Sequence, residues 1–375
     1  MSYRDRVAAP GRKKLLTIDG GGIRGVLSLE ILRAMETMLR RETGAGDDFV
    51  LADYFDYVAG TSTGAIIAAG LARGMSVNEL RTLYAEHGVD MFDRAWLLRR
   101  YQYKYGATRL QTLLQDTFGA TTAFGSDELR TLLMMVLRNA TTDSPWPLSN
   151  NPRAKYNRQD RADNNLLLPL WQLVRASTAA PVYFPPELVK VGDHDFVFVD
   201  GGLTMYNNPA FQLFLMATHE KYALQWPTGE DRMLLVSVGT GTSPKADDRL
   251  RPGDMNLLFN ASSVPAALMS AALYEQDALC RILGRCRHGA VIDRELGDLT
   301  DGASVVESRL FSYVRYNAEL TREGLDGLGL TDVRPEDVQP LDSVEHIGEL
   351  QRVGMSAALE VDRAHFTGFI EPQAG

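Results

Sequence analysis

Short apolar segments bounded by glycine alternate with segments of helical periodicity along the first 245 residues. Residues 13–19 (KKLLTID) and 53–60 (DYFDYVAG) have the apolar content typical of buried strands. After the first of them, apolar residues recur at helical spacing at Leu29, Leu32, Met35 and Leu39. Residues 62–74 predict a helix directly after the second, and 196–202 and 233–241 predict two further strands. This alternation predicts an α/β fold in which helices cover a largely parallel sheet.

The pattern changes beyond residue 245. Residues 244–254 (PKADDRLRPGD) are polar and contain proline, which is typical of an excursion from the core. Residues 255–290 and 343–362 have helical periodicity. We therefore divide the chain into a domain at 13–245 and a mainly helical region at 246–375, which we expect to pack on that domain.

Composition limits the class of protein. The chain has 375 residues, of which 45% are hydrophobic, so it can bury a large core. Its net charge is −9, with 39 basic and 48 acidic residues, which argues against a general nucleic-acid binder. The first residues lack the apolar stretch of a secretory signal, and runs such as GAIIAAGLA are too short to cross a bilayer. We expect a soluble cytoplasmic protein.

The two cysteines, Cys280 and Cys286, match no zinc-binding signature. One pair is also too few to crosslink a chain of this length. We expect two reduced thiols within a helical segment and no metal site.

The sequence LLTIDGGGIRGVLSLEIL places three glycines between a predicted strand and a predicted helix. Gly20, Gly21 and Gly22 leave backbone amides open to a negatively charged ligand near the positive end of the helix. Arg24 would add positive charge or order this loop, although an arginine at such a position is more commonly solvated. A dinucleotide pyrophosphate and a catalytic oxyanion would both suit such a loop.

The dinucleotide interpretation rests on Gly20, Gly22 and Gly25, which match G-x-G-x-x-G after a strand. That fingerprint also requires an acidic residue at the end of the second strand. Asp47 and Asp48 instead precede the second predicted strand. The continuation therefore disfavours a dinucleotide.

The second predicted strand ends in GTSTG, which comprises residues 60–64. Between a strand and a helix, G-x-S-x-G forms a sharp turn that exposes the serine, here Ser62, as a nucleophile. The same five residues would also suit a turn of small residues that packs a helix closely on a strand. Because parallel strands end at the same edge of a sheet, the glycine loop would place its amides beside Ser62, as in an oxyanion hole.

A serine nucleophile needs a base. Asp200 ends a predicted strand and precedes Gly201 and Gly202, although an aspartate there is commonly a turn former. A Ser-His-Asp triad would require a histidine instead. The chain has six histidines, none in a recognisable motif: His87, His194, His219, His288, His346 and His365.

Three motifs occur in order along the chain: DGGGIRG at 19–25, GTSTG at 60–64 and DGG at 200–202. Together they resemble the patatin-like phospholipase family. Two further segments are also similar to that family: RASTAAPVYFPP at 175–186 and SVGTG at 237–241. The resemblance covers residues 13–245 and implies a catalytic domain built as a three-layer α/β/α sandwich.

The resemblance also implies the roles of the site residues. It implies that Ser62 is the nucleophile and that Asp200 is its only partner. The resemblance thus favours a catalytic dyad over a Ser-His-Asp triad. The implied oxyanion hole consists of Gly20, Gly21, Gly22 and Arg24. The remaining motif glycines are Gly25, Gly60, Gly64, Gly201 and Gly202.

The implied activity is hydrolysis of fatty acyl esters of phospholipids or other lipids, of the phospholipase A type. It needs no metal or cofactor, and it implies a cytoplasmic enzyme that contacts membrane surfaces transiently. Two alternatives stay open. One is a bacterial effector with the same chemistry, silent until a ligand or partner binds. The other is a catalytically inactive lipid- or nucleotide-binding scaffold, against which the three intact motifs argue.

Overall fold

In the part of the chain that the computed structural model describes, nine strands form one sheet. The described residues are 2–92, 103–181, 184–243, 251, 257–292, 297, 299–300 and 305–370. The strands of this part are β1 (Lys13–Ile18), β2 (Tyr57–Thr61), β3 (Leu132–Asn139), β4 (Ser144–Ser149), β5 (Glu187–Val191), β6 (His194–Asp200), β7 (Met233–Val238), β8 (Arg285–His288) and β9 (Ser312–Tyr316). Their order is β5-β6-β3-β2-β1-β7-β9-β8, and β4 pairs with β3.

Strand direction divides the sheet into two parts. The pairs formed by β3, β2, β1, β7, β9 and β8 are parallel, as predicted for an α/β protein. The pairs of β3 with β4 and β6, and of β5 with β6, are antiparallel. Every residue of β2 and β7 is buried, because helices cover both faces of the sheet there.

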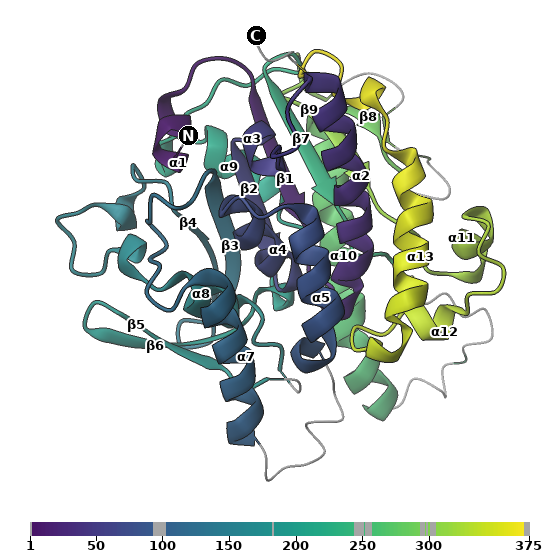
Figure 1. Cartoon of the computed structure of the whole chain (residues 1–375), viewed down its shortest axis with the longest axis horizontal. Helices are drawn as coiled ribbons and strands as arrows, with labels where there is room; N and C mark the ends of the chain where they lie inside the picture. The colour runs from purple at the N-terminus through teal and green to yellow at the C-terminus, as the bar shows by residue number, and fades with distance from the viewer. Residues whose placement is uncertain are drawn as a thin grey trace.

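Helices lie on both faces of the sheet. Those of the described part are α1 (Tyr3–Ala8), α2 (Gly25–Thr43), α3 (Leu51–Tyr54), α4 (Thr63–Ala72), α5 (Val77–Phe92), α7 (Tyr103–Phe118), α8 (Leu170–Ser177), α9 (Ala210–Thr218), α10 (Leu257–Leu283), α11 (Arg322–Gly327), α12 (Pro335–Val338) and α13 (Ile347–Ala357). In the view of Figure 1, α2, α4, α5, α8 and α13 lie in front of the sheet, and α9 and α10 lie behind it. The predicted α/β/α layering is confirmed. None of these helices combines the length and the apolar character needed to cross a bilayer.

Two predicted elements differ from the structure. Residues 53–60 do not form one strand, since α3 occupies the first of them and β2 begins at Tyr57. The Asp53 carboxylate accepts a hydrogen bond from the Val50 amide at 3.0 Å, which caps a helical turn there. The helix predicted over 255–290 ends at Leu283, and residues 285–288 form β8 because they pair with β9. Cys280 therefore lies in a helix and Cys286 in a strand, and no disulfide joins them.

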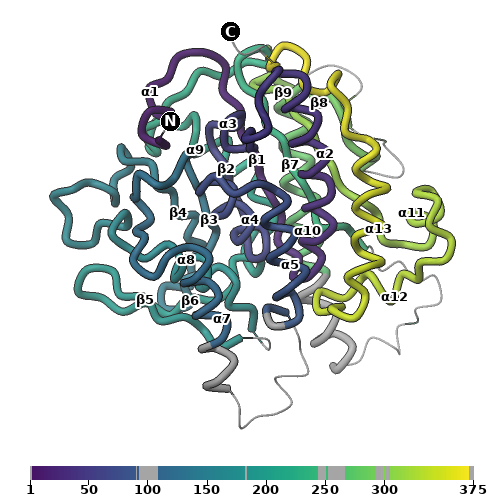
Figure 2. Tube along the Cα trace, viewed as in Figure 1, coloured from purple at the N-terminus to yellow at the C-terminus, as the bar shows by residue number. Residues whose placement is uncertain are grey.

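The C-terminal part of the chain shares the central sheet. Strands β9 and β8 extend it beyond β7, and α13 runs alongside α2 (Figure 2). The helix predicted over 343–362 corresponds to α13, flanked by 3-10 turns on both sides. The polar excursion predicted at 244–254 lies outside the described residues except for Arg251.

Candidate active site

Three of the predicted motifs meet at one edge of the sheet. Strands β1 and β2 are parallel, and Ile18 is opposite Gly60, so the glycine loop and Ser62 follow neighbouring strand ends. Asp200 is the last residue of β6 and is opposite Leu137 of β3. The carboxyl ends of parallel strands are where α/β proteins commonly build their sites.

Ser62 lies in a strained turn between β2 and α4. Its φ of +54° falls in the left-handed region that an L-residue with a side chain rarely adopts. The flanking glycines permit the turn: a Cβ at Gly60 would lie 2.0 Å from the Gly64 carbonyl oxygen, and one at Gly64 would lie 2.2 Å from the Ile18 carbonyl oxygen. Ser62 is partly exposed at the N-terminus of α4.

The Ser62 hydroxyl and the Asp200 carboxylate form a direct hydrogen bond. Ser62 Oγ donates to Asp200 Oδ2 at 2.6 Å, and the Gly202 amide donates to Asp200 Oδ1 at 2.6 Å. Burial raises the pKa of Asp200 to about 6, although both hydrogen bonds and the charge of Arg175 act in the opposite direction. This carboxylate is therefore a stronger base than a free aspartate.

The C-terminal end of α8 and the residues just after it bond to the backbone of both Ser62 and Asp200. Ser177 Oγ accepts a hydrogen bond from the Ser62 amide at 3.0 Å and donates to the Val136 carbonyl at 2.7 Å. The Asp200 amide donates to the Ala179 carbonyl at 2.9 Å. Ser177 and Ala179 thus tie the backbones of Ser62 and Asp200 to the same short stretch of chain. Neither residue could be given a role from the sequence, although both lie in the family-like segment RASTAAP, which pointed to this part of the chain.

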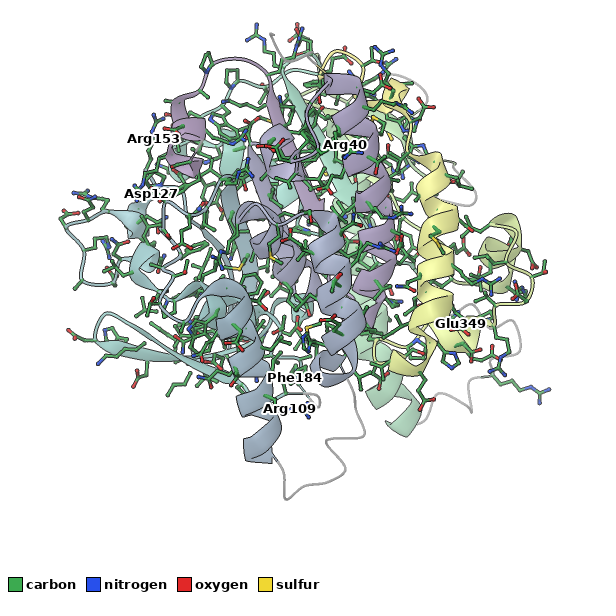
Figure 3. The ribbon with its side chains drawn as sticks, viewed as in Figure 1. Arg40, Arg109, Asp127, Arg153, Phe184 and Glu349 are labelled. Atoms are coloured by element: carbon green, nitrogen blue, oxygen red, sulfur yellow. The ribbon has the colours of Figure 1, made fainter. Side chains whose placement is uncertain are left out.

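Arg175 is a second residue that the sequence analysis did not single out. It is buried, and one guanidinium nitrogen donates to the Pro185 carbonyl at 3.0 Å. The guanidinium carbon lies 5.2 Å from the ring centre of Phe184, which is labelled at the lower end of the molecule in Figure 3. Its positive charge acts on Asp200 and favours the ionised carboxylate.

The three glycines of the loop differ in what their amides bind. The Gly20 amide donates to the Asn207 carbonyl at 3.0 Å, so it is already occupied. Within the described residues, the Gly21 and Gly22 amides make no hydrogen bond to the rest of the chain. A Cβ at Gly21 would lie 2.1 Å from Thr240 Oγ1, and Gly22 has a φ of +58°. The loop therefore requires glycine and leaves two amides for a ligand.

Arg24 orders the loop. It is buried, and Nη1 donates to the Gln339 carbonyl at 3.3 Å. Burial lowers the pKa of Arg24 to about 10, opposed by the negative charge of Asp19. The neighbouring Ile23 amide donates to the Leu341 carbonyl at 3.0 Å, so the C-terminal part holds this end of the loop.

The remaining motif glycines also lie where a side chain would collide. A Cβ at Gly25, the first residue of α2, would lie 2.5 Å from Thr63 Oγ1. Gly201 and Gly202 form the 3-10 turn after β6, and a Cβ at Gly201 would lie 2.1 Å from the Val136 carbonyl oxygen.

No recorded hydrogen bond joins a histidine of the described segments to Ser62 or Asp200. The six rings have contacts elsewhere: His87 with Glu86, His194 with Phe196, His219 with Tyr222, His288 with Glu360, His346 with Asp337 and Glu349, and His365 with Tyr316. The described segments also hold no cluster of three or more histidine, cysteine, aspartate or glutamate side chains suited to a metal ion.

Comparison with known proteins agrees with the motifs. A family model described as patatin-like phospholipase matches residues 16–214. The chain is 29% identical to the cGAMP-activated phospholipase of Escherichia coli (strain TW11681), over 61% of this chain and 62% of that protein. It is 32% identical to the intracellular phospholipase A2 of Caenorhabditis elegans, over 61% of this chain and 20% of that protein. It is 29% identical to patatin-2-Kuras 4 of Solanum tuberosum, over 62% of this chain and 63% of that protein. The chain therefore spans less than two thirds of the length of each relative.

Proposed function

The chain belongs to the patatin-like phospholipase family, and on that premise we propose that it is a lipid acyl hydrolase of the phospholipase A type. The observation that carries this proposal is the 2.6 Å hydrogen bond from Ser62 Oγ to the buried Asp200 carboxylate. A hydroxyl in a strained turn, bonded to a carboxylate with a raised pKa, suits nucleophilic catalysis. Two of the relatives are named phospholipases, which supports a phospholipid as the substrate.

The proposed reaction has two steps. Ser62 Oγ attacks the ester carbonyl carbon while Asp200 takes the hydroxyl proton, and the carbonyl oxygen becomes an oxyanion. The Gly21 and Gly22 amides hold this oxyanion, and Arg24 and Gly20 keep the loop in shape. As the tetrahedral intermediate collapses, the lipid alcohol leaves with the proton from Asp200. Water then attacks the acyl-enzyme while Asp200 takes its proton, and the bond from the acyl carbon to Ser62 Oγ breaks as Asp200 returns that proton to Ser62, which releases the fatty acid.

Hydrolysis of phospholipid vesicles tests this function. We expect purified protein to release equal amounts of free fatty acid and lysophospholipid from phosphatidylcholine vesicles. Pretreatment with a fluorophosphonate, which modifies an activated serine, should stop the release and label the protein. Absence of both release and labelling, with cGAMP as well as without it, would contradict a hydrolase and favour the inactive binding scaffold.

The E. coli relative favours a second candidate, in which the same hydrolase is silent until a ligand or partner binds. The vesicle assay separates the two when it is run with and without cGAMP. Release without any addition supports an enzyme that is always active. Release that requires cGAMP supports the gated form.

We also propose that the enzyme contacts lipid through the apolar side chains beside Asp200. Leu203 and Met205 follow the DGG motif and are 42% and 48% exposed. Exposed apolar side chains at a site for lipid substrates suit contact with a membrane surface, since burying one in lipid contributes about 1.5–3 kcal/mol. The net charge of −9 gives no general attraction to anionic lipids, so apolar contact carries the binding.

Replacing both side chains by serine should weaken vesicle binding. For Leu203→Ser with Met205→Ser we expect sedimentation with phosphatidylcholine vesicles to weaken by about tenfold or more, because each half-exposed side chain loses about half of that free energy, roughly 0.7–1.5 kcal/mol. Hydrolysis of a water-soluble short-chain ester should stay within about twofold of wild type, since neither side chain takes part in the chemistry. The matched control is Leu359→Ser with Met355→Ser, a second exposed pair that lies on α13 and the turn after it. Equal losses in both double variants would contradict a specific contact at the site.

A further inference from the structure

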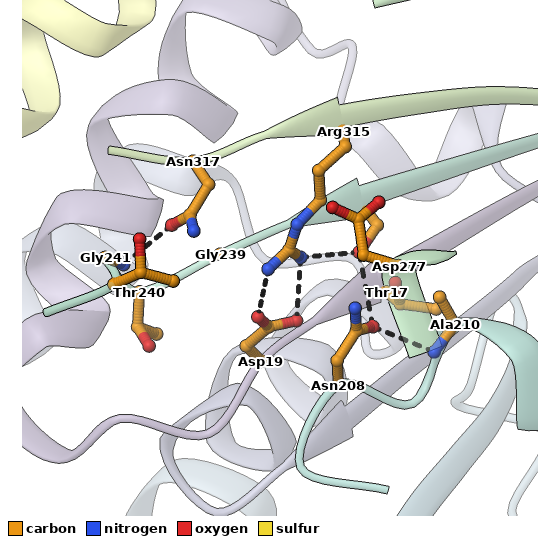
Figure 4. A network of polar contacts seen from close by, with 12 residues as sticks. Thr17, Asp19, Asn208, Ala210, Gly239, Thr240, Gly241, Asp277, Arg315 and Asn317 are labelled. Carbon is orange, nitrogen blue, oxygen red and sulfur yellow. Dashed lines mark hydrogen bonds and ion pairs between the residues drawn. The ribbon is translucent and has the colours of Figure 1, made fainter. Parts of the chain in front are cut away.

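A buried ion pair joins the C-terminal part of the chain to the glycine loop. Arg315 lies on β9, and Asp19 directly follows β1 and precedes Gly20 (Figure 4). Arg315 Nη1 donates to Asp19 Oδ1 at 3.0 Å, and Nη2 donates to Asp19 Oδ2 at 2.5 Å. The two side chains are 4% and 2% exposed. The contact is bidentate and shielded from water, which is the geometry of a strong charge-assisted pair.

Arg315 reaches Asp19 across β7, which lies between β1 and β9. Its Nη1 also donates to Ser237 Oγ on β7 at 2.7 Å. The Asp19 amide donates to the Val238 carbonyl of the same strand at 3.0 Å. Burial acts to lower the pKa of Arg315, but the Asp19 carboxylate outweighs burial and raises it, so the guanidinium stays charged. Asp19 is therefore held from two sides at the start of the loop.

The loop between Asp19 and α2 has few other contacts that fix its position. The Gly20 amide donates to Asn207, and the Gly20 carbonyl accepts from Thr240 Oγ1 at 2.8 Å. At the other end, Ile23 and Arg24 donate to the carbonyls of residues 341 and 339. The Gly21 and Gly22 amides make no hydrogen bond within the described part of the chain. Their position is therefore fixed by the contacts of the residues on either side of them.

We propose that Arg315 is a positioning residue for the oxyanion loop, acting through Asp19 on the Gly21 and Gly22 amides. The inference rests on the proposed function of that loop. Oxyanion donors accelerate a reaction only when they are held in place before the charge develops, so a loop tied at one end alone would lose part of the effect. Arg315 also neutralises a carboxylate next to the loop, which would otherwise repel the oxyanion. Arg315 lies outside the residues 16–214 that the family model matches.

The double variant Arg315→Met with Asp19→Asn tests this role. Replacing Arg315 alone would leave the buried Asp19 carboxylate without a counter-charge and destabilise the fold. Removing both charges avoids this loss of stability. We expect kcat on a phospholipid to fall about 100-fold, by analogy with losing one oxyanion donor, and KM to stay within about threefold. Arg315→Lys keeps the charge without the bidentate contact, so its kcat should fall less, about tenfold. The acid limb of the pH profile should not move, because the Ser62–Asp200 pair is unchanged.

The matched control is a second buried ion pair at the opposite ends of the strands. Arg6 Nη1 donates to Asp56 Oδ1 at 3.1 Å, just before β2 begins. We expect Arg6→Met with Asp56→Asn to lower the melting temperature and to leave kcat within about threefold of wild type.

Three outcomes would overturn the positioning role. They are wild-type kcat in the Arg315/Asp19 double variant, equal kcat losses in the two double variants, and wild-type kcat in Arg315→Lys if the double variant does not fold. A wild-type protein that hydrolyses no ester would instead contradict the proposed function itself, so the two failures are distinguishable.

Discussion

Ser62→Ala should lower phospholipid hydrolysis by about 10⁴-fold or more, because it removes the proposed nucleophile. The change deletes one oxygen atom, whose recorded hydrogen bond goes to Asp200. Alanine keeps the Cβ that already occupies the strained turn at φ +54°, so the backbone of the elbow gains no new strain. The Ser62 amide also keeps its bond to Ser177, so the fold should be preserved.

Fatty acid release from vesicles and labelling by a fluorophosphonate measure this effect. Both should be lost in Ser62→Ala, while circular dichroism and the melting temperature stay close to those of wild type. A folded variant that keeps even about a tenth of wild-type turnover would rule out Ser62 as the nucleophile.

Asp200→Asn should be as inactive as Ser62→Ala. Asparagine is nearly isosteric, and its carbonyl oxygen can still accept the Gly202 amide, but it cannot take the proton from Ser62 Oγ. The pKa of Asp200 is about 6 in the folded protein against 3.8 for a free aspartate. Such a group stabilises the fold fully below about pH 4, and this contribution is lost as the pH rises through about 6. At pH 8 the ionised carboxylate therefore opposes folding, so we expect the variant to melt no lower than wild type there.

The same carboxylate predicts how the wild-type rate depends on pH. The base must be ionised, so kcat/KM on a soluble ester should rise about tenfold per pH unit below about pH 6 and level off above it. A histidine base would give a similar curve, so the six single histidine variants are the control. Each should keep most activity if it folds, and a folded histidine variant as inactive as Ser62→Ala would mean a triad.

The sequence alone predicted the layered α/β fold. Apolar runs such as 13–19 and 233–241 predict buried strands because both faces of the sheet are covered, and this property is visible in a short window. The two errors, at 53–56 and 285–288, arose where local signals compete. Asp53 caps a helical turn in the first case, and in the second a strand forms only because β9 pairs with it.

In the candidate site too, some features could be predicted from the sequence and others depend on the tertiary structure. The glycine loop and GTSTG could be predicted because their backbone geometry requires glycine at fixed positions, which is a local constraint written in the sequence. The bonds that Ser177 and Arg315 make at the site could not be predicted, since these residues lie 115 and 296 residues from Ser62 and Asp19. Serine and arginine are common residues with no periodicity of their own. Only the packing of distant strands brings their side chains to the site, so the tertiary structure alone decided which of them bond there.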